Sequence, residues 1–150
     1  MKSNNGFTLI ELLAVIVILA IIALIAAPII VGLIDDARRE SAANSAYGVY
    51  HAAENVYAKV LIANKSGLPA NIVYTFNGTG VTIGYGDADA TDLPTEWGIE
   101  ATDAELDFKG TMPTAGVLTL NNSGEVNVTT DLKINNYNCS IGTNDVFTCQ

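Results

Sequence analysis

One carboxylate at the start of a long apolar segment is the residue whose placement most needs an explanation. Glu11 is followed by Leu12–Ile34, 23 residues without a charged or hydrogen-bonding side chain. A carboxylate within such a segment costs about 2.5–3.5 kcal/mol at a helix centre and less near its end, and it usually has a partner. We therefore expect Glu11 either to reach the lipid headgroups or to meet a cationic group.

The residues just before Glu11 contain a peptide bond suited to proteolysis. Gly6 has no side chain, so the Gly6–Phe7 bond can enter a narrow protease site in an extended form. Cleavage there would create a cationic amine on Phe7, four residues before Glu11. Amine and carboxylate carry opposite charges, and both need compensation in a membrane or in a dry protein core.

The apolar segment itself predicts a membrane-spanning helix. Its 23 residues would form a helix about 35 Å long, enough for a hydrocarbon core of about 30 Å. An ordinary secretory signal peptide fits less well, because its apolar part runs about 7–15 residues and ends in a small-residue cleavage site. A plain single-pass anchor explains the length but gives Glu11 no role.

The segment Gly6-Phe7-Thr8-Leu9-Ile10-Glu11-Leu12-Leu13, preceded by a short leader with Lys2, closely resembles the cleavage and methylation motif of type IV prepilins. The resemblance implies that a prepilin peptidase cuts after Gly6 and methylates the new amino group of Phe7, leaving 144 residues. It also implies that Glu11 meets the N-terminal amine of a neighbouring subunit and sets the axial stagger between subunits.

A proline interrupts the apolar segment. Pro28 removes one backbone hydrogen bond and bends or opens a helix, and Gly32 follows it closely. The position of Pro28, 21 residues after Phe7, matches a proline often seen in type IV pilins, where the surrounding helix melts on assembly. We expect Pro28 and Gly32 to form such a melting point; a tolerated membrane kink is the alternative.

The helix is predicted to continue beyond the membrane to about Asn64. From Asp35 to Asn64 there is no proline and one glycine, and Gly67 and Pro69 then give a stop signal. Apolar residues recur at three- and four-residue steps and form one stripe that we expect to dock on a sheet. The stripe consists of Ala46, Val49, Tyr50, Ala53, Val56, Tyr57 and Val60.

The C-terminal part reads as an antiparallel sheet. The first predicted hairpin has a turn at 77–80 and consists of the strands Asn71–Phe76 and Val81–Tyr85. The second has a turn at 121–124 and consists of the strands Gly116–Leu120 and Glu125–Thr129. Leu132–Ile134 is a further candidate strand, and a short helical piece is expected near Thr102–Leu106. The fold class is therefore α+β, a long N-terminal helix packed on a small antiparallel sheet, as in the pilin fold. The expected regions are a leader (1–6), a membrane or filament-core helix (7–34), its amphipathic continuation (35–66) and a β-sheet head (67–150).

Two cysteines, Cys139 and Cys149, lie ten residues apart near the C-terminus. Export to an oxidising compartment favours a disulfide between them, and several type IV pilins close a C-terminal loop in this way. Two free thiols are the alternative. A Cys-rich metal site is excluded by the count.

Little in the chain predicts catalysis, and no cofactor is expected. His51, the one histidine, lies on the predicted helix, and no nucleophile–base pair or phosphate loop accompanies it. An acidic stretch could hold calcium, but it lacks the glycine and the terminal glutamate of an EF-hand loop, so we favour a solvated loop and no metal. The stretch comprises Asp87, Asp89, Asp92, Glu96, Glu100, Asp103, Glu105 and Asp107.

Composition agrees with a hydrophobic helix joined to an acidic domain. Apolar residues make up 49% of the 150 residues, yet the formal net charge is −9. Such an acidic chain argues against binding to nucleic acid, because phosphates require clustered Lys and Arg. The resemblance implies a type IV pilus subunit that self-assembles, alone or with other pilins, after storage as a single-pass protein of the cytoplasmic membrane. Its expected partners are the prepilin peptidase, the pilus assembly machinery and the membrane, and its destination is the cell surface.

Two alternatives stay open at this level. A pseudopilin of a type II secretion or competence system shares the same N-terminus. A membrane-anchored ectodomain that binds a ligand or acts as an enzyme would keep Met1 and would not self-assemble.

Overall fold

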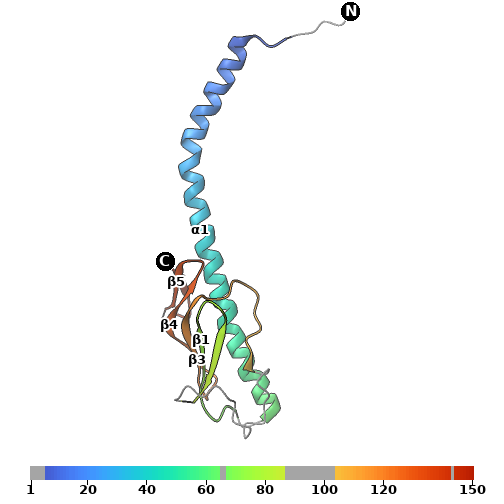
Figure 1. The fold of residues 1–150 in the computed structure, drawn as a ribbon, viewed down its shortest axis with the longest axis vertical. Coiled ribbons are helices and arrows are strands. Elements are labelled where there is room, and N and C mark those ends of the chain that lie inside the picture. Colours follow the sequence, from blue (N-terminus) through green and yellow to red (C-terminus); the bar gives the residue numbers. More distant parts are fainter. Residues whose placement is uncertain (1–5, 65–66, 87–103, 143) are drawn as a thin grey trace, which may run out of the picture. The chain divides into compact units, whose positions relative to one another are not determined.

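The computed structural model describes residues 6–64, 67–86, 104–142 and 144–150. The chain divides into two compact units, Met1–Ala37 and Arg38–Gln150. One helix, α1 (Leu9–Asn64), contributes to both units and is followed by six strands (Figure 1). The strands are β1 (Ile72–Phe76), β2 (Val81–Tyr85), β3 (Ala115–Leu120), β4 (Val126–Ile134), β5 (Tyr137–Ile141) and β6 (Phe147–Cys149).

The six strands form one antiparallel sheet in the order β2-β1-β3-β4-β5-β6. Only the pairing of β1 with β3 joins strands that are not consecutive in the chain. The register places large side chains opposite one another, with Ile72 beside Leu120 and Tyr74 beside Leu118. These four side chains are all fully buried, so one face of the sheet is its core face.

The pairing of β3 with β4 shifts register twice between Ala115 and Leu118. Such bulges let two residues of one strand oppose one residue of the other. Gly116 lies in this irregular part with a φ of 127°, and a Cβ there would meet the backbone of Asp131 and Leu132. The positive φ and the lack of space for a Cβ together require a glycine at this position.

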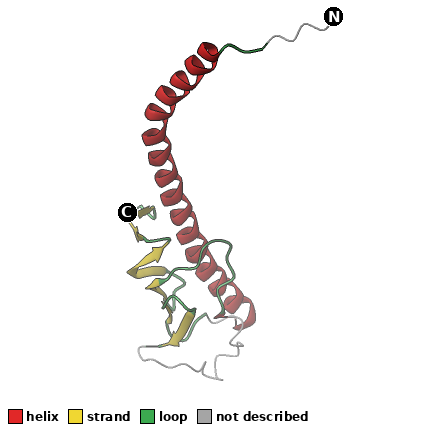
Figure 2. Ribbon diagram, turned by 45° about the horizontal axis from the view of Figure 1, so that its top comes forward, coloured by secondary structure: helices red, strands yellow, loops and turns green. Residues whose placement is uncertain are grey.

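The C-terminal part of α1, from Arg38 to Asn64, packs on the core face of the sheet (Figure 2). Its inward side chains are small or β-branched, which allows the helix backbone to come close to the sheet. They are Ala42, Ala46, Val49, Ala53, Val56 and Val60, each no more than 1% exposed. Tyr57 lies over the β3–β4 turn at Gly124, where the space for a Cβ is taken by the tyrosine ring.

Hydrogen bonds from α1 and β1 hold the segment 104–113 against the rest of the second unit. The buried Ser45 hydroxyl donates to the Ser41 carbonyl at 3.0 Å and accepts the Thr111 amide at 3.1 Å. The Tyr74 hydroxyl donates to the Ala104 carbonyl at 2.9 Å. Because the phenol is buried, its pKa is raised well above the ordinary value, with a smaller contribution from Tyr85.

The α+β prediction is confirmed, and so is the end of the helix at Asn64. The five aliphatic members of the predicted stripe are buried, and Tyr50 and Tyr57 are half-buried against the same core. Both predicted hairpins pair as expected.

Two details of the strand prediction were wrong. Leu132–Ile134 is not a separate strand but the end of β4, which continues through Thr130 and Asp131 because its two register shifts, one on each side of the pair Val117–Thr130, do not end the pairing with β3. β5 and β6 were missed, although β5 alternates between apolar and polar residues; β6 has only three residues, too few to indicate a strand. The helical piece expected near Thr102–Leu106 lies partly outside the described residues; within them, Ala104 has 3₁₀ conformation and Glu105 lies in a bend.

Candidate processing and assembly site

The Gly6–Phe7 bond lies in a short non-helical segment before α1. Gly6, Phe7 and Thr8 are all exposed, and Phe7 is 92% exposed. A Cβ on Gly6 would meet no atom within 4 Å, so nothing in the described part of the chain shields the bond. A peptide bond outside regular structure and open on all sides is the kind that a protease can bind in an extended form.

Thr8 and Glu11 close the start of α1 with three reciprocal hydrogen bonds. The Glu11 carboxylate accepts the Thr8 backbone amide and the Thr8 hydroxyl, both at 2.8 Å. The Glu11 amide in turn donates to the Thr8 hydroxyl oxygen at 3.3 Å. This is a capping box, in which the side chains at the first and fourth positions satisfy backbone amides that the helix leaves free.

The capping box adds a function for Glu11 that the sequence analysis missed. The signal was present, since Thr8-Leu9-Ile10-Glu11 has the spacing of a capping box before an apolar run. Within one chain, the carboxylate is hydrogen-bonded and lies at the positive end of the helix dipole.

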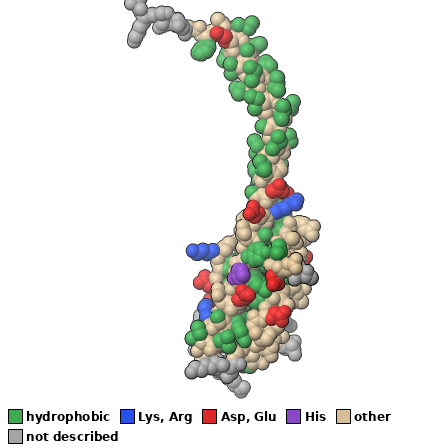
Figure 3. Space-filling view, turned by 180° about the vertical axis from the view of Figure 1, so that it is seen from behind, with side chains coloured by type: hydrophobic (Ala, Val, Ile, Leu, Met, Phe, Trp, Pro, Cys, Tyr) green, Lys and Arg blue, Asp and Glu red, His purple; other side chains and the backbone are tan. Residues whose placement is uncertain are grey.

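The remainder of the first unit is an apolar helix without a core of its own. Every large hydrophobic side chain from Leu12 to Ile34 is exposed, Ile34 least at 45%. The space-filling view shows hydrophobic side chains following one another along this part of α1 (Figure 3). Among the described residues, α1 is the one helix long and apolar enough to cross a membrane.

Pro28 and Gly32 lie inside α1, which is helical on both sides of them. A Cβ on Gly32 would meet no atom within 4 Å, so no other described segment of the chain approaches it. In the isolated chain the two residues therefore occupy an intact helix. Their role as a melting point on assembly stays a prediction.

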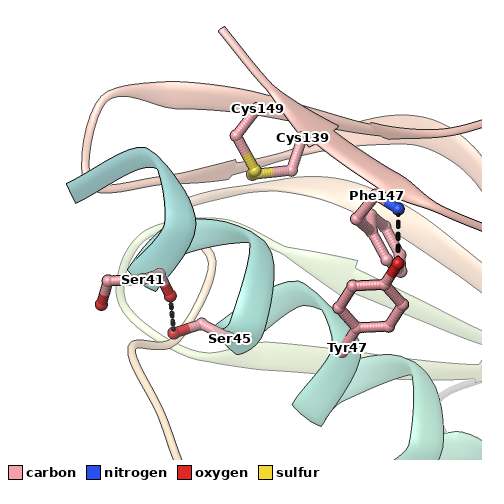
Figure 4. The surroundings of a disulfide bond; sticks show 6 residues. All are labelled: Ser41, Ser45, Tyr47, Cys139, Phe147 and Cys149. Carbon is pink, nitrogen blue, oxygen red and sulfur yellow. Dashed lines mark hydrogen bonds between the residues drawn. A yellow bond between two sulfur atoms is a disulfide. The ribbon is translucent and has the colours of Figure 1, made fainter. Parts of the chain in front are cut away.

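At the other end of the chain, Cys139 and Cys149 form a disulfide (Figure 4). The two residues are direct partners in the pairing of β5 with β6. Asn138 and Gln150 exchange two backbone hydrogen bonds beside them, at 2.9 and 3.1 Å. The bond therefore links the edge strand β6 covalently to β5.

Tyr47 of α1 contacts β6, the same edge strand, and the residues just before it. Its hydroxyl accepts the Phe147 amide at 3.0 Å and donates to the Asp145 carbonyl at 3.3 Å. Its ring meets the Phe147 ring edge to face, with 5.0 Å between centroids. Figure 4 shows this contact and the disulfide on the same β5–β6 hairpin, which the Tyr47 contacts attach to α1 and the pairing of β5 with β4 attaches to the sheet.

The residues considered for catalysis or metal binding do not form a site in the described part of the chain. His51 is exposed, and its Nδ1 lies 2.7 Å from a Glu54 carboxylate oxygen. Within that part, no three metal-ligating side chains gather. Of the acidic stretch, Glu105 and Asp107 are described and exposed, and the other six members fall outside the described residues.

The comparisons with known proteins point to the same N-terminal segment. Residues 1–27 match the family described as the prokaryotic N-terminal methylation motif, which is the signature of type IV prepilin leaders. No curated protein and no solved structure matches the chain. The motif indicates a type IV pilin-like prepilin, a structural subunit that a prepilin peptidase processes, and the exposed apolar helix fits membrane anchoring.

Proposed function

We propose that this protein is the structural subunit of a type IV pilus. In this proposal the chain is cleaved between Gly6 and Phe7, methylated on the Phe7 amine, held in the cytoplasmic membrane by α1 and then polymerised into a surface filament. The observation that carries the proposal is the methylation motif at residues 1–27 leading directly into an apolar helix segment with no core of its own.

The assembly step rests on Glu11. A methylated amine on Phe7 is still a cation, and in the filament core it would need an anionic partner. Glu11 is the one acidic residue before Asp35. When the Phe7 amine of an incoming subunit reaches Glu11 of its neighbour, the pair compensates both charges and fixes the axial position of one helix against the other.

The apolar surface supplies the driving force for assembly. Side chains such as Leu19 and Ile22, at 58% and 56% exposed, find no partner within the described chain. In a bilayer these side chains contact lipid, and in a filament they would contact the same segment of other copies. Pro28 and Gly32 would then let the helix open locally as its surroundings change from lipid to protein.

Intact-mass spectrometry on filaments sheared from native cells tests the proposal. We expect an abundant chain of 144 residues that begins at Phe7 and carries one added methyl group. Finding the processed chain in membranes and never in filaments would favour a pseudopilin of a secretion or competence system. A chain that still begins at Met1 would refute the proposal and leave a membrane-anchored ectodomain.

A further inference from the structure

A polar notch lies where α1 meets the turn between β4 and β5. It has a volume of about 550 Å³ and is lined by Arg38, Asn135 and Asn136. Asn135 and Asn136 form the two-residue turn between the paired Ile134 and Tyr137, with φ values of 51° and 72°. A turn with two positive φ values has a fixed backbone geometry, so the two asparagines are held in place next to Arg38.

We propose that this notch binds the phosphate of a phospholipid headgroup while the subunit is stored in the membrane. The inference rests on the proposed function, because it requires α1 to be membrane-inserted. It adds a ligand and a binding site that the processing and assembly residues do not include.

The donors in the notch suit a phosphodiester. The Arg38 guanidinium is permanently charged and offers several N–H donors in a planar fork, and each asparagine amide offers two more. No carboxylate forms an ion pair with Arg38 in the described part of the chain, whereas the neighbouring Arg39 is engaged and lies 6.0 Å from the Tyr137 ring centroid. Arg38 is therefore the guanidinium available for an external anion.

Arg38 follows closely after the membrane-spanning segment, which favours a lipid headgroup as the source of the phosphate. The apolar segment ends at Ile34, and four residues span at most about 14 Å even when fully extended. The headgroup layer begins where the hydrocarbon ends and is about 5–8 Å thick on each side of a bilayer. With Leu12–Ile34 in the hydrocarbon, Arg38 lies no more than about 14 Å beyond its edge, and its long side chain can reach back to the lipid phosphates.

Because acidic residues lie nearby, lipid binding at this site must depend on direct hydrogen bonds to the phosphate and not on a net positive charge of the protein surface. Asp35, Asp36 and Glu40 outnumber Arg38 and Arg39, so this part of the chain presents no net positive charge to an anionic surface. A phosphate is held there only if it enters the notch and meets the guanidinium and amide donors. We therefore expect zwitterionic and anionic phospholipids to bind, and lipids without a phosphate not to bind.

Native mass spectrometry of the full chain in detergent micelles tests the proposal. The chain is mixed with equal amounts of phosphatidylglycerol, phosphatidylcholine or diacylglycerol, which has no phosphate. We expect the two phospholipids to be retained and diacylglycerol not to be retained. Arg38→Gln should lower phospholipid retention about fivefold, the order of one arginine's contribution near a lipid surface.

Two further variants separate the site from nonspecific effects. Replacing both Asn135 and Asn136 by glycine keeps a turn that accepts positive φ, removes the amide donors and should also lower retention. Lys59→Gln removes an exposed cation elsewhere on α1 and should leave retention unchanged. Circular dichroism of each variant verifies that the head is folded.

Three results would overturn the inference: unchanged retention in Arg38→Gln, equal retention of diacylglycerol, or complete displacement of the lipid by millimolar inorganic phosphate. The last would identify the ligand as a free anion instead of a headgroup. Failure of the proposed pilus function is distinguishable, because it appears as an uncleaved Met1 in the mass of the native chain.

Discussion

The two units use apolar residues in opposite ways. In the first unit, Leu12–Ile34 carries an uninterrupted apolar surface that stays exposed. In the second, Val49, Val56 and Val60 of the same helix α1 are at most 1% exposed, because the sheet covers them. The second unit therefore satisfies its apolar residues within one chain, and the first needs lipid or other copies to do so.

Substitutions in the two units should therefore have different consequences. In the second unit they should change the free energy of unfolding of the chain. In the first unit they should leave that quantity unchanged and should affect assembly.

The largest effect is expected for Glu11→Ala. Cleavage after Gly6 should continue, because Gly6 and Phe7 are exposed and do not depend on the carboxylate. Polymerisation should fall by at least about tenfold, since an unpaired amine in a dry core costs more than about 1.4 kcal/mol. Sheared filaments quantified against membrane-bound chain measure this ratio.

Glu40→Ala is the matched control for Glu11→Ala. It removes an exposed glutamate of α1 from the second unit and should not change the filament yield. Normal filaments in Glu11→Ala would show that this carboxylate is not needed for assembly. Its main role would then be the capping box at the start of α1.

Leucines offer a direct comparison of the two units. Leu118→Ala empties a fully buried position in the sheet and should lower the free energy of unfolding by about 2–5 kcal/mol. Leu19→Ala removes the same atoms from a side chain that is 58% exposed, and should leave that free energy unchanged. Urea titration of the full chain in detergent micelles, followed by near-ultraviolet circular dichroism, gives both values. Equal losses for the two variants would contradict the division into a self-sufficient and a dependent unit.

The disulfide should contribute somewhat less than the core leucine. Replacing Cys139 and Cys149 together by alanine removes a link across ten residues and should cost about 2–3 kcal/mol. The loss should first free β6, so protease cleavage after Phe147 should become faster. A neighbouring Ser140→Ala variant is the control. If cleavage there is unchanged in the double variant, the Tyr47 contacts and the β5–β6 backbone hydrogen bonds hold the edge without the disulfide.

The sequence predicted those parts of the fold that have a strong local signal. The apolar segment, the stripe on α1 and the hairpins around Asn77–Gly80 and Asn121–Gly124 were all recognisable, since each repeats at the period of its element or contains a typical turn. The buried Ser45 was not predictable, because a serine in a helix gives no sign that the Thr111 amide will come to it.

β6 shows why the remainder could not be predicted. β6 has three residues, and its position depends on Cys139, on the backbone of Asn138 and on the Tyr47 hydroxyl, 100 residues before Phe147. Three residues are too few to show a period, so β6 could not be predicted, whereas β5 does alternate between apolar and polar residues and its signal was overlooked. The candidate processing residues were the easiest to predict, because Gly6, Phe7 and Glu11 belong to one contiguous motif.

Alkaline pH should destabilise the second unit through its buried phenol. The pKa of Tyr74 is raised above its ordinary value of 10.0 by burial, so the folded chain keeps a proton that the unfolded chain loses. Its contribution is fully present below pH 10 and declines above it, by about 1.4 kcal/mol per pH unit. Urea titrations between pH 9 and 11.5 measure the slope.

Tyr74→Phe should reduce this slope by one proton, although it also lowers the stability at neutral pH because the Ala104 carbonyl loses its donor. Tyr85→Phe should reduce the slope further, since burial raises the pKa of Tyr85 as well. A slope that is identical in the wild type and in Tyr74→Phe would show that another group governs alkaline unfolding.

The smallest effect concerns the capping box of Thr8 and Glu11 in the first unit. Thr8→Ala removes the hydroxyl that bonds the Glu11 amide and carboxylate, and should loosen the first turn of α1 by about 1 kcal/mol. Thr8→Ser keeps the hydroxyl and is the matched control. Amide hydrogen exchange of Leu9–Leu12 in micelles measures the change, with faster exchange expected in Thr8→Ala alone. Because this contact is local, the free energy of unfolding of the second unit should not move. A lower free energy of unfolding of the second unit in Thr8→Ala would mean that the two units are energetically coupled. It would contradict the view that the first unit contributes to assembly alone.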